Sequence, residues 1–224
     1  MNAVRRIARN TISLSIAELI GKLGHFLIFV YIARAMGTLI FGTFNFAYAL
    51  SLIAVVFTDI GINFMIIREA SKDRSKISSY IGSSFLIKIA FSIITYSIVI
   101  LIMKLVNYPA ATKAVVYLIF TYIVIRSLSE LLFSVFKAFE SMHYEAIIKI
   151  ATTFALVAIT AYAIMQKSGL IAIGFVYVAV QAISFIITFL IVMKKFVKIS
   201  FKFDINISKE IIQKAFPFTF SLIF

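Results

Sequence analysis

The chain has 224 residues, of which 62% are hydrophobic and only 14% are charged, and its mean hydropathy is +1.07. A soluble domain has about 45–50% apolar and about 25% charged residues, so this composition excludes an ordinary soluble fold. The absence of cysteine excludes disulfides and thiolate chemistry. The formal net charge of +13 would suit a nucleic-acid partner, but the cations lie at the borders of apolar segments, so we expect no nucleic acid.

The apolar segments are long enough to form helices that cross a membrane. A spanning helix needs about 20 mostly apolar residues, and residues 35–58 and 168–193 reach that length without one charge. Strands of a membrane barrel would be about 10 residues long and would alternate in polarity, which these segments do not. The expected fold is therefore all-α, a polytopic transmembrane bundle with helices over residues 11–33, 43–66, 81–103, 114–136, 146–165 and 170–193.

The C-terminal region is expected to hold a linker and the start of a seventh helix. Residues 198–208 alternate between apolar and polar side chains, which favours an extended segment at the membrane interface. Ser208 is a suitable N-cap for a helix that is still apolar at Phe224. We therefore divide the chain into a six-helix transmembrane lobe (1–193), a cytoplasmic interfacial linker (194–210) and a truncated seventh helix (211–224), as expected for one half of a larger protein.

Positive charges are distributed unequally between the two sets of loops. With a cytoplasmic N-terminus, fourteen lysines and arginines fall on the cytoplasmic borders and four on the outer borders. Because cytoplasmic loops of membrane proteins carry an excess of cations, this count predicts a multi-pass protein of the cell membrane with its N-terminus in the cytoplasm. The remaining four of the 22 cations, Lys22, Lys88, Arg126 and Lys149, fall inside the predicted spans.

The first span carries Glu18, Lys22 and His25, at spacings of four and three that place them on one helix face. A lone cation near mid-membrane costs about 2.5–3.5 kcal/mol on insertion scales, so Lys22 needs a partner or water. An internal pair of Glu18 with Lys22 and a water-filled cavity are both compatible with this spacing. For His25, a structural hydrogen bond is favoured over a proton relay.

The fourth span carries Arg126 near its centre and Glu130 four residues later. Arg126 lies too deep to extend easily to the interface, and its planar guanidinium suits a phosphate or a carboxylate. We favour a cavity-lining role for Arg126 over a structural ion pair with Glu130 or Asp59.

The other charged positions lie nearer the ends of their spans. Asp59 and Asn63 share a face of the second span, and Lys88 enters the third span from the same side of the membrane. Lys149 is close enough to the end of its span to extend outward to the interface. The candidate ligands of an anionic substrate are Lys22, Arg126 and Lys88, and the candidates for ion coupling or charge tuning are Glu18, Asp59, Glu130 and His25.

Motifs of enzymes that work on membrane substrates are missing from the sequence. A membrane prenyltransferase needs clustered aspartates to hold magnesium, but Asp59, Asp73 and Asp204 are isolated. No HExxH, GxSxG or Walker-type loop occurs, and two distant histidines make a poor metal site. We therefore expect no catalytic residue, no metal site and no cofactor.

Several short stretches, taken in order, resemble one known family. They are residues 21–24 (GKLG), 31–37 (YIARAMG), 41–47 (FGTFNFA), 58–63 (TDIGIN), 67–70 (IREA) and 136–142 (FKAFESM). Together they resemble the N-terminal half of polysaccharide (O-antigen-type) flippases, in the multidrug/oligosaccharidyl-lipid/polysaccharide exporter superfamily. Members of that family have a second lobe, and the two lobes flank a central cavity.

The resemblance implies a secondary transporter rather than an enzyme. Its substrate would be a polyprenyl-diphosphate-linked oligosaccharide, flipped across the cytoplasmic membrane for surface polysaccharide biosynthesis. Its partners would be the lipid bilayer and a C-terminal lobe of the same protein. Related lipid II flippases carry essential cations on the first helix, and the matching position here is Lys22. The open alternatives are a cation-coupled multidrug exporter of the same superfamily, a membrane polysaccharide polymerase and a non-transporting fragment.

Overall fold

The computed structural model describes residues 3–59, 61–73, 76–201 and 205–223, and within these ranges the chain forms eight helices and no strand. The predicted all-α fold is confirmed. The helices are α1 (Ala3–Met36), α2 (Thr38–Asp59), α3 (Ile62–Lys72), α4 (Ile77–Leu105), α5 (Ala110–Ala138), α6 (Met142–Met165), α7 (Leu170–Lys195) and α8 (Ile205–Ile223). Arg74 and Lys202, two of the predicted border cations, lie outside the described residues.

Six of the described helices are long and apolar enough to cross a membrane: α1 from Asn10 onward, α2, α4, α5, α6 and α7. Large apolar side chains on the outside of these helices are more than half exposed, for example Phe26, Ile53, Leu101, Phe154 and Ile183. Exposed apolar surface spread over five helices is suited to lipid rather than to water. The structure therefore supports a multi-pass membrane protein.

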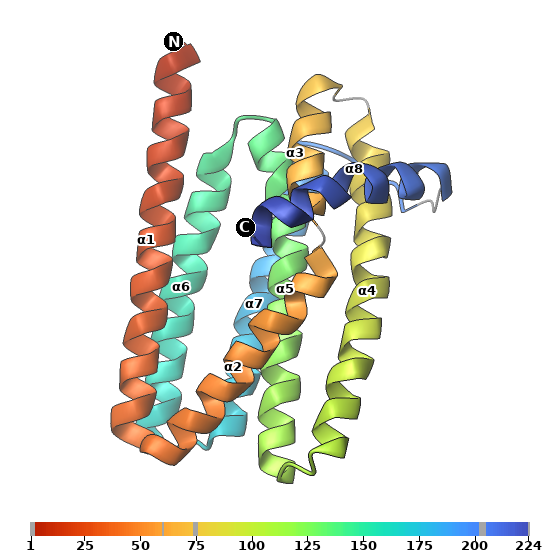
Figure 1. The fold of residues 1–224 in the computed structure, drawn as a ribbon. Helices are drawn as coiled ribbons and strands as arrows, with labels where there is room; N and C mark the ends of the chain where they lie inside the picture. The colour runs from red at the N-terminus through yellow and green to blue at the C-terminus, as the bar shows by residue number, and fades with distance from the viewer. Residues whose placement is uncertain (1–2, 60, 74–75, 202–204, 224) are drawn as a thin grey trace.

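Helix α5 forms the centre of the bundle. Over half of its most apolar window, 56%, is buried, against 22–33% for the other five spans. It packs against α7 and α2, whereas α1 packs mainly against α6. Figure 1 shows the pair α1 and α6 on one side of α5 and α4 on the other, with α2 crossing in front. The N-terminus and α8 lie at the same end of the bundle, which we call the N-terminal end.

The second predicted helix, over residues 43–66, is wrong as a single element. The structure ends α2 at Asp59 and begins α3 at Ile62, with Gly61 at a left-handed φ of 65°. Glycine populates positive φ without a Cβ clash, so this position supplies the change of direction. The sequence did not reveal this break, because the apolar run continues across it and a hydropathy pattern does not report a single backbone dihedral angle.

The segment that leaves α7 is fixed against α4. The Ser78 hydroxyl donates to the carbonyl of Lys198 over 2.6 Å, and a Cβ added at Gly82 would collide with the carbonyl oxygen of Ser200. Residues 197–201 are not helical, in keeping with the extended segment predicted from residue 198, but α8 already begins at Ile205. The prediction is therefore wrong for residues 205–208, and residues 202–204 lie outside the described part of the chain.

A cluster of four side chains ties α8 to α3 and α4, and we call Glu69, Tyr80, Glu210 and Lys214 the α8 latch. Lys214 Nζ lies 2.7 Å from Glu69 Oε2 and 2.7 Å from Glu210 Oε1, and the Tyr80 hydroxyl donates to Glu210 over 2.9 Å. Hydrogen bonds from Lys214 and Lys72 lower the pKa of Glu69 to about 2. The hydrogen bond from Lys214 also lowers the pKa of Glu210. The latch thus holds ionised carboxylates at neutral pH.

Candidate functional site

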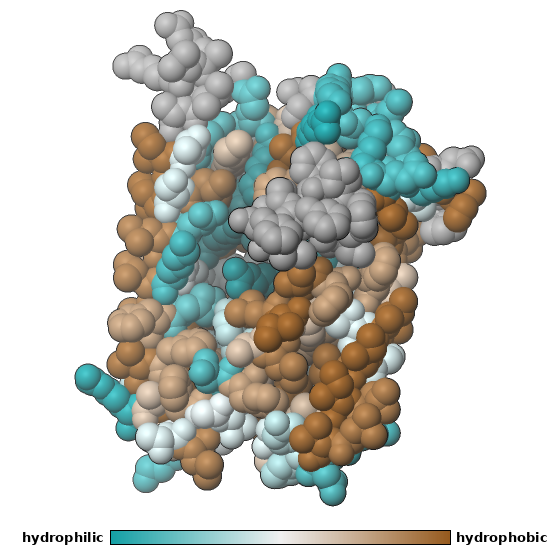
Figure 2. Space-filling model, in the orientation of Figure 1, coloured by the Kyte–Doolittle hydropathy of each residue, from teal (hydrophilic) through white to brown (hydrophobic). Residues whose placement is uncertain are grey.

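A polar cavity of about 520 Å³ lies among the spanning helices α1, α2, α5, α6 and α7. Ligand pockets in proteins usually measure about 300–1,000 Å³, so this space is large enough for a small molecule or a headgroup. Its charged lining consists of Glu18, Lys22, Arg126, Glu130, Lys137 and Lys149, with His25 beside them. Figure 2 shows hydrophilic residues gathered in a furrow beside α1, while apolar residues cover much of the rest of this face. Charges inside membrane spans are costly, so a shared water-filled cavity explains why they occur together.

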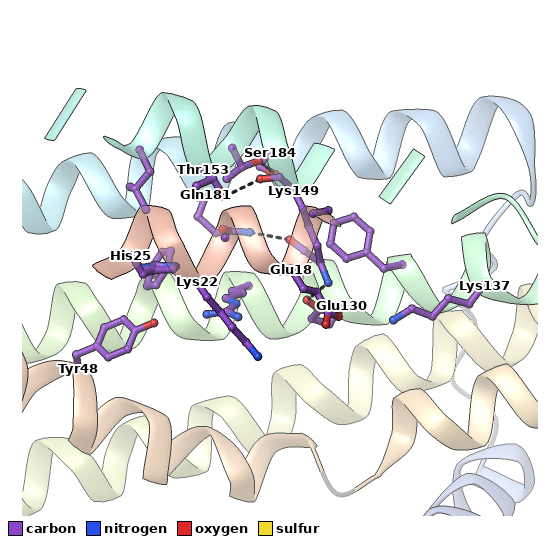
Figure 3. Close-up of a pocket in the computed structure, with 18 residues that line it drawn as sticks. Glu18, Lys22, His25, Tyr48, Glu130, Lys137, Lys149, Thr153, Gln181 and Ser184 are labelled. Carbon is purple, nitrogen blue, oxygen red and sulfur yellow. Dashed lines mark hydrogen bonds and ion pairs between the residues drawn. The ribbon is translucent and has the colours of Figure 1, made fainter. Parts of the chain in front are cut away.

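One face of helix α1 lines this cavity. Glu18, Lys22 and His25 all line it, as their spacing predicts. Figure 3 shows Lys22 extending into the open part of the cavity and His25 near Tyr48, with ring centroids of these two residues 6.0 Å apart. No hydrogen-bond partner for the buried Nδ1 of His25 is found among the described residues, so the structural hydrogen bond favoured from the sequence is not found at this atom.

Two cavity cations lack a carboxylate partner. Among the residues that the structure describes, neither Lys22 nor Arg126 takes part in an ion pair. The pair of Lys22 with Glu18, left open from the sequence, is therefore not formed in this structure. Arg126 is not tied to Glu130 or Asp59 either, because these carboxylates pair with Lys149 and Lys88. Both cations are thus available to an anion.

The other two cavity cations are paired, and one of them was wrongly placed from the sequence. Lys149 does not extend outward: its Nζ lies 3.1 Å from Glu130 Oε1 and 2.8 Å from Glu145 Oε1. Lys137 Nζ lies 3.3 Å from the same oxygen of Glu145. Sequence reasoning also missed Glu145, although its position four residues before Lys149 is the favoured spacing for a helical ion pair.

The sequence matches the polysaccharide biosynthesis protein family over residues 7–224. The chain belongs to this family. The match spans nearly all of the described helices, so the resemblance seen in the sequence is confirmed at the level of the family. A comparison with curated proteins gave no match.

In this member of the polysaccharide biosynthesis family, hydroxyl and amide groups form the wall of the cavity opposite α2. Gln181 Nε2 donates to Ser129 Oγ over 3.0 Å, and Thr152 Oγ1 donates to Ser184 Oγ over 2.7 Å. These bonds link α5 with α7 and α6 with α7, and all four side chains line the cavity. Each amide or hydroxyl keeps further hydrogen-bonding capacity. The wall therefore offers neutral polar groups beside the charged ones.

Two predicted site residues of this family member, Lys88 and Asp59, lie outside the cavity. Lys88 Nζ is 2.9 Å from Asp59 Oδ1, and it donates to the hydroxyl and the carbonyl oxygen of Ser127 over 3.0 and 3.1 Å. Lys88 is only 1% exposed, and Asn63 donates to the second oxygen of Asp59. The pair joins α4, α5 and the end of α2 next to the break at Gly61. Its geometry is that of a structural tie rather than of a ligand site.

Proposed function

We propose that this chain is the N-terminal lobe of a secondary transporter that moves polyprenyl-diphosphate-linked oligosaccharide across the cytoplasmic membrane. The observation that carries the proposal is the pair of cations without a carboxylate partner among the described residues, Lys22 and Arg126, inside a cavity bounded by membrane-spanning helices. Membership of the polysaccharide biosynthesis family supports the choice of a glycan as cargo.

The cavity chemistry suits each part of such a headgroup. A diphosphate that links a lipid to a sugar carries one negative charge on each phosphate, and a guanidinium can contact phosphate oxygens through two parallel hydrogen bonds. The hydroxyl and amide wall, with Ser129, Thr152, Gln181 and Ser184, offers partners for sugar hydroxyls. The polyprenyl tail is apolar and would therefore remain in the lipid that surrounds the apolar outer faces of the helices.

The remaining expectations belong to the same proposal. The excess of cations at the N-terminal end of the bundle supports a cytoplasmic location for that end. Glu18, Glu130 and His25 line the cavity and are candidates for ion coupling or charge tuning. Lys88 and Asp59 are left out of the proposed ligand and coupling residues, because they pair with each other outside the cavity. Transport would need no cofactor: this lobe would move against a second, C-terminal lobe, powered by an ion gradient or the membrane potential.

The proposal predicts that Arg126→Ala abolishes export while the protein still enters the membrane, because the cavity loses one of its two available cations. The measurement is mass spectrometry of lipid extracts from cells that lack the gene and carry the full-length protein with this change. Polyprenyl-diphosphate oligosaccharide should accumulate as in the deletion strain. Arg34→Ala, at an exposed position at the opposite end of α1, is the matched control and should restore export.

Normal export by the Arg126→Ala protein would contradict the proposal. A lipid pool that does not change on deletion of the gene, combined with loss of efflux of cationic dyes, would instead favour the multidrug exporter. The net excess of cations in the cavity lining argues against that alternative, since four cations there face two carboxylates.

A further inference from the structure

Glu145 is a fully buried carboxylate behind the wall of the cavity. Its exposed fraction is 0%, it does not line the cavity, and its Oε1 contacts the ammonium groups of Lys149 and Lys137, which do. A buried charge is very costly unless it is paired, so Glu145 depends on these two lysines for its stability in the fold. The helix dipoles also favour the charges of Glu145 and Lys137. Glu145 lies in the first turn of α6, where a negative charge is stabilised, and Lys137 lies in the last turn of α5, where a positive charge is stabilised.

The two lysines and two carboxylates form a chain of contacts without net charge. It runs from Lys137 to Glu145, from Glu145 to Lys149 and from Lys149 to Glu130, with ion-pair distances of 3.3, 2.8 and 3.1 Å. The ring of Phe133 lies 5.3 Å from the ammonium group of Lys149 and covers it on another side. An ammonium group held in this way is neutralised by its neighbours before any ligand arrives.

We propose that Glu145 sets how many cations the cavity offers to an anionic ligand, and so acts as a specificity-determining residue that never touches the ligand. By holding Lys137 and Lys149 with the help of Glu130, it leaves only Lys22 and Arg126 available in the described lining. Two available cations match the two charges of a diphosphate diester, so this inference rests on the proposed function. The carboxylate of Glu18 also lines the cavity, but it is exposed and therefore screened by water.

This arrangement has a physical advantage for a transporter. A ligand must bind well enough to enter and weakly enough to leave on the other side of the membrane. Four unpaired cations in a partly desolvated cavity would hold a diphosphate tightly, because charges interact more strongly at low dielectric constant. A counter-charge placed behind the wall weakens this attraction without occupying the space that the ligand needs.

The test is binding of inorganic pyrophosphate to the purified full-length protein in detergent, measured by isothermal titration calorimetry. Glu145→Gln keeps the shape of the side chain, releases Lys137 and leaves Lys149 paired with Glu130 alone, so pyrophosphate should bind at least about fivefold more tightly than to the wild type. Glu210→Gln, a matched change in the α8 latch, should leave the affinity within about twofold. An affinity of Glu145→Gln that is unchanged or weaker would overturn the inference.

A second variant covers the case in which Glu145→Gln does not fold. The double change Glu145→Gln with Lys149→Gln removes one negative and one positive charge together, so its pyrophosphate affinity should stay within about twofold of the wild type. A loss of about tenfold would show that Lys149 is itself a ligand and would overturn the inference. If neither the wild type nor any variant binds pyrophosphate, both this inference and the anion site of the proposed function are wrong. The export measurement is separate, because it tests only the transport activity.

Discussion

Lys88 is among the largest side chains that the described part of the chain buries completely, and it carries a positive charge. Its position is explained by three oxygen contacts: one from the carboxylate of Asp59 and two from Ser127. Burial of an ammonium group is tolerated when a carboxylate and further acceptors surround it. The residue therefore tells more about how α2, α4 and α5 are held together than about ligand binding.

Asp59→Asn should destabilise the protein by about 3 kcal/mol, because it leaves Lys88 buried without a counter-charge. The double change Asp59→Asn with Lys88→Met should cost less than Asp59→Asn alone, since it also removes the unpaired cation. The measurement is the apparent melting temperature of the purified protein in detergent. A double variant that melts below the single variant would contradict this account of the pair.

Sequence reasoning succeeded in predicting which residues share a helix face, and it failed to predict which side chains form ion pairs. The face shared by Glu18, Lys22 and His25 follows from helical geometry alone, and the structure places all three in the cavity. Lys149 was expected to extend outward, although Glu145 on the same helix lies at the spacing that favours an ion pair. The other partner of Lys149, Glu130, comes from α5, and no periodicity in α6 indicates which residue of a neighbouring helix will face it.

At the scale of the helices, the sequence predicted all six spans. A segment of about 20 apolar residues crosses a bilayer as a helix, because a helix satisfies its own backbone hydrogen bonds in lipid. The sequence did not predict where helices break or how they pack. The end of α2 at Asp59 depends on one left-handed glycine, and the early start of α8 at Ile205 lies within a region of alternating polarity. In both places a local conformation overrode the pattern of hydropathy.

Gly82 in α4 shows how close two elements come. A methyl group there would collide with the main chain of Ser200, so Gly82→Ala should displace the segment after α7 and cost about 1–3 kcal/mol. Gly42→Ala in α2 is the matched control, because no atom lies within 4 Å of the added Cβ and alanine favours the helix. Thermal unfolding in detergent compares the two variants, and equal stability of both would refute the close contact.

At the scale of the whole molecule, the α8 latch joins the C-terminal helix to the rest of the bundle. Its ion pairs weaken as the pH falls, because they require the carboxylate of Glu69 to be ionised. This pKa is lowered from 4.5 to about 2, so the stabilisation is complete above about pH 4.5 and is lost as the pH falls through about 2. The lowered pKa of Glu210 acts in the same direction.

A nitroxide spin label on Ile212→Cys, a partly exposed position of α8, should therefore become more mobile as the pH falls from about 4.5 to about 2. Residues 1–224 contain no cysteine of their own, so this label would be the only one within them. Adding Lys214→Met should make the label mobile already at pH 7. The same label on Ile93→Cys, exposed in α4, should stay unchanged, which separates undocking of α8 from unfolding of the bundle. A pH-independent signal at position 212 would rule out the latch.

The neutral set of charges formed by Glu130, Lys137, Glu145 and Lys149 has a consequence for biosynthesis. All four residues come from α5 and α6, which follow each other in the chain and are joined by the short turn over residues 139–141. When such a hairpin enters the bilayer as one unit, its charges are already paired and no later helix is needed to shield them. The features that set the charge of the cavity would then also make its wall insertable into a membrane.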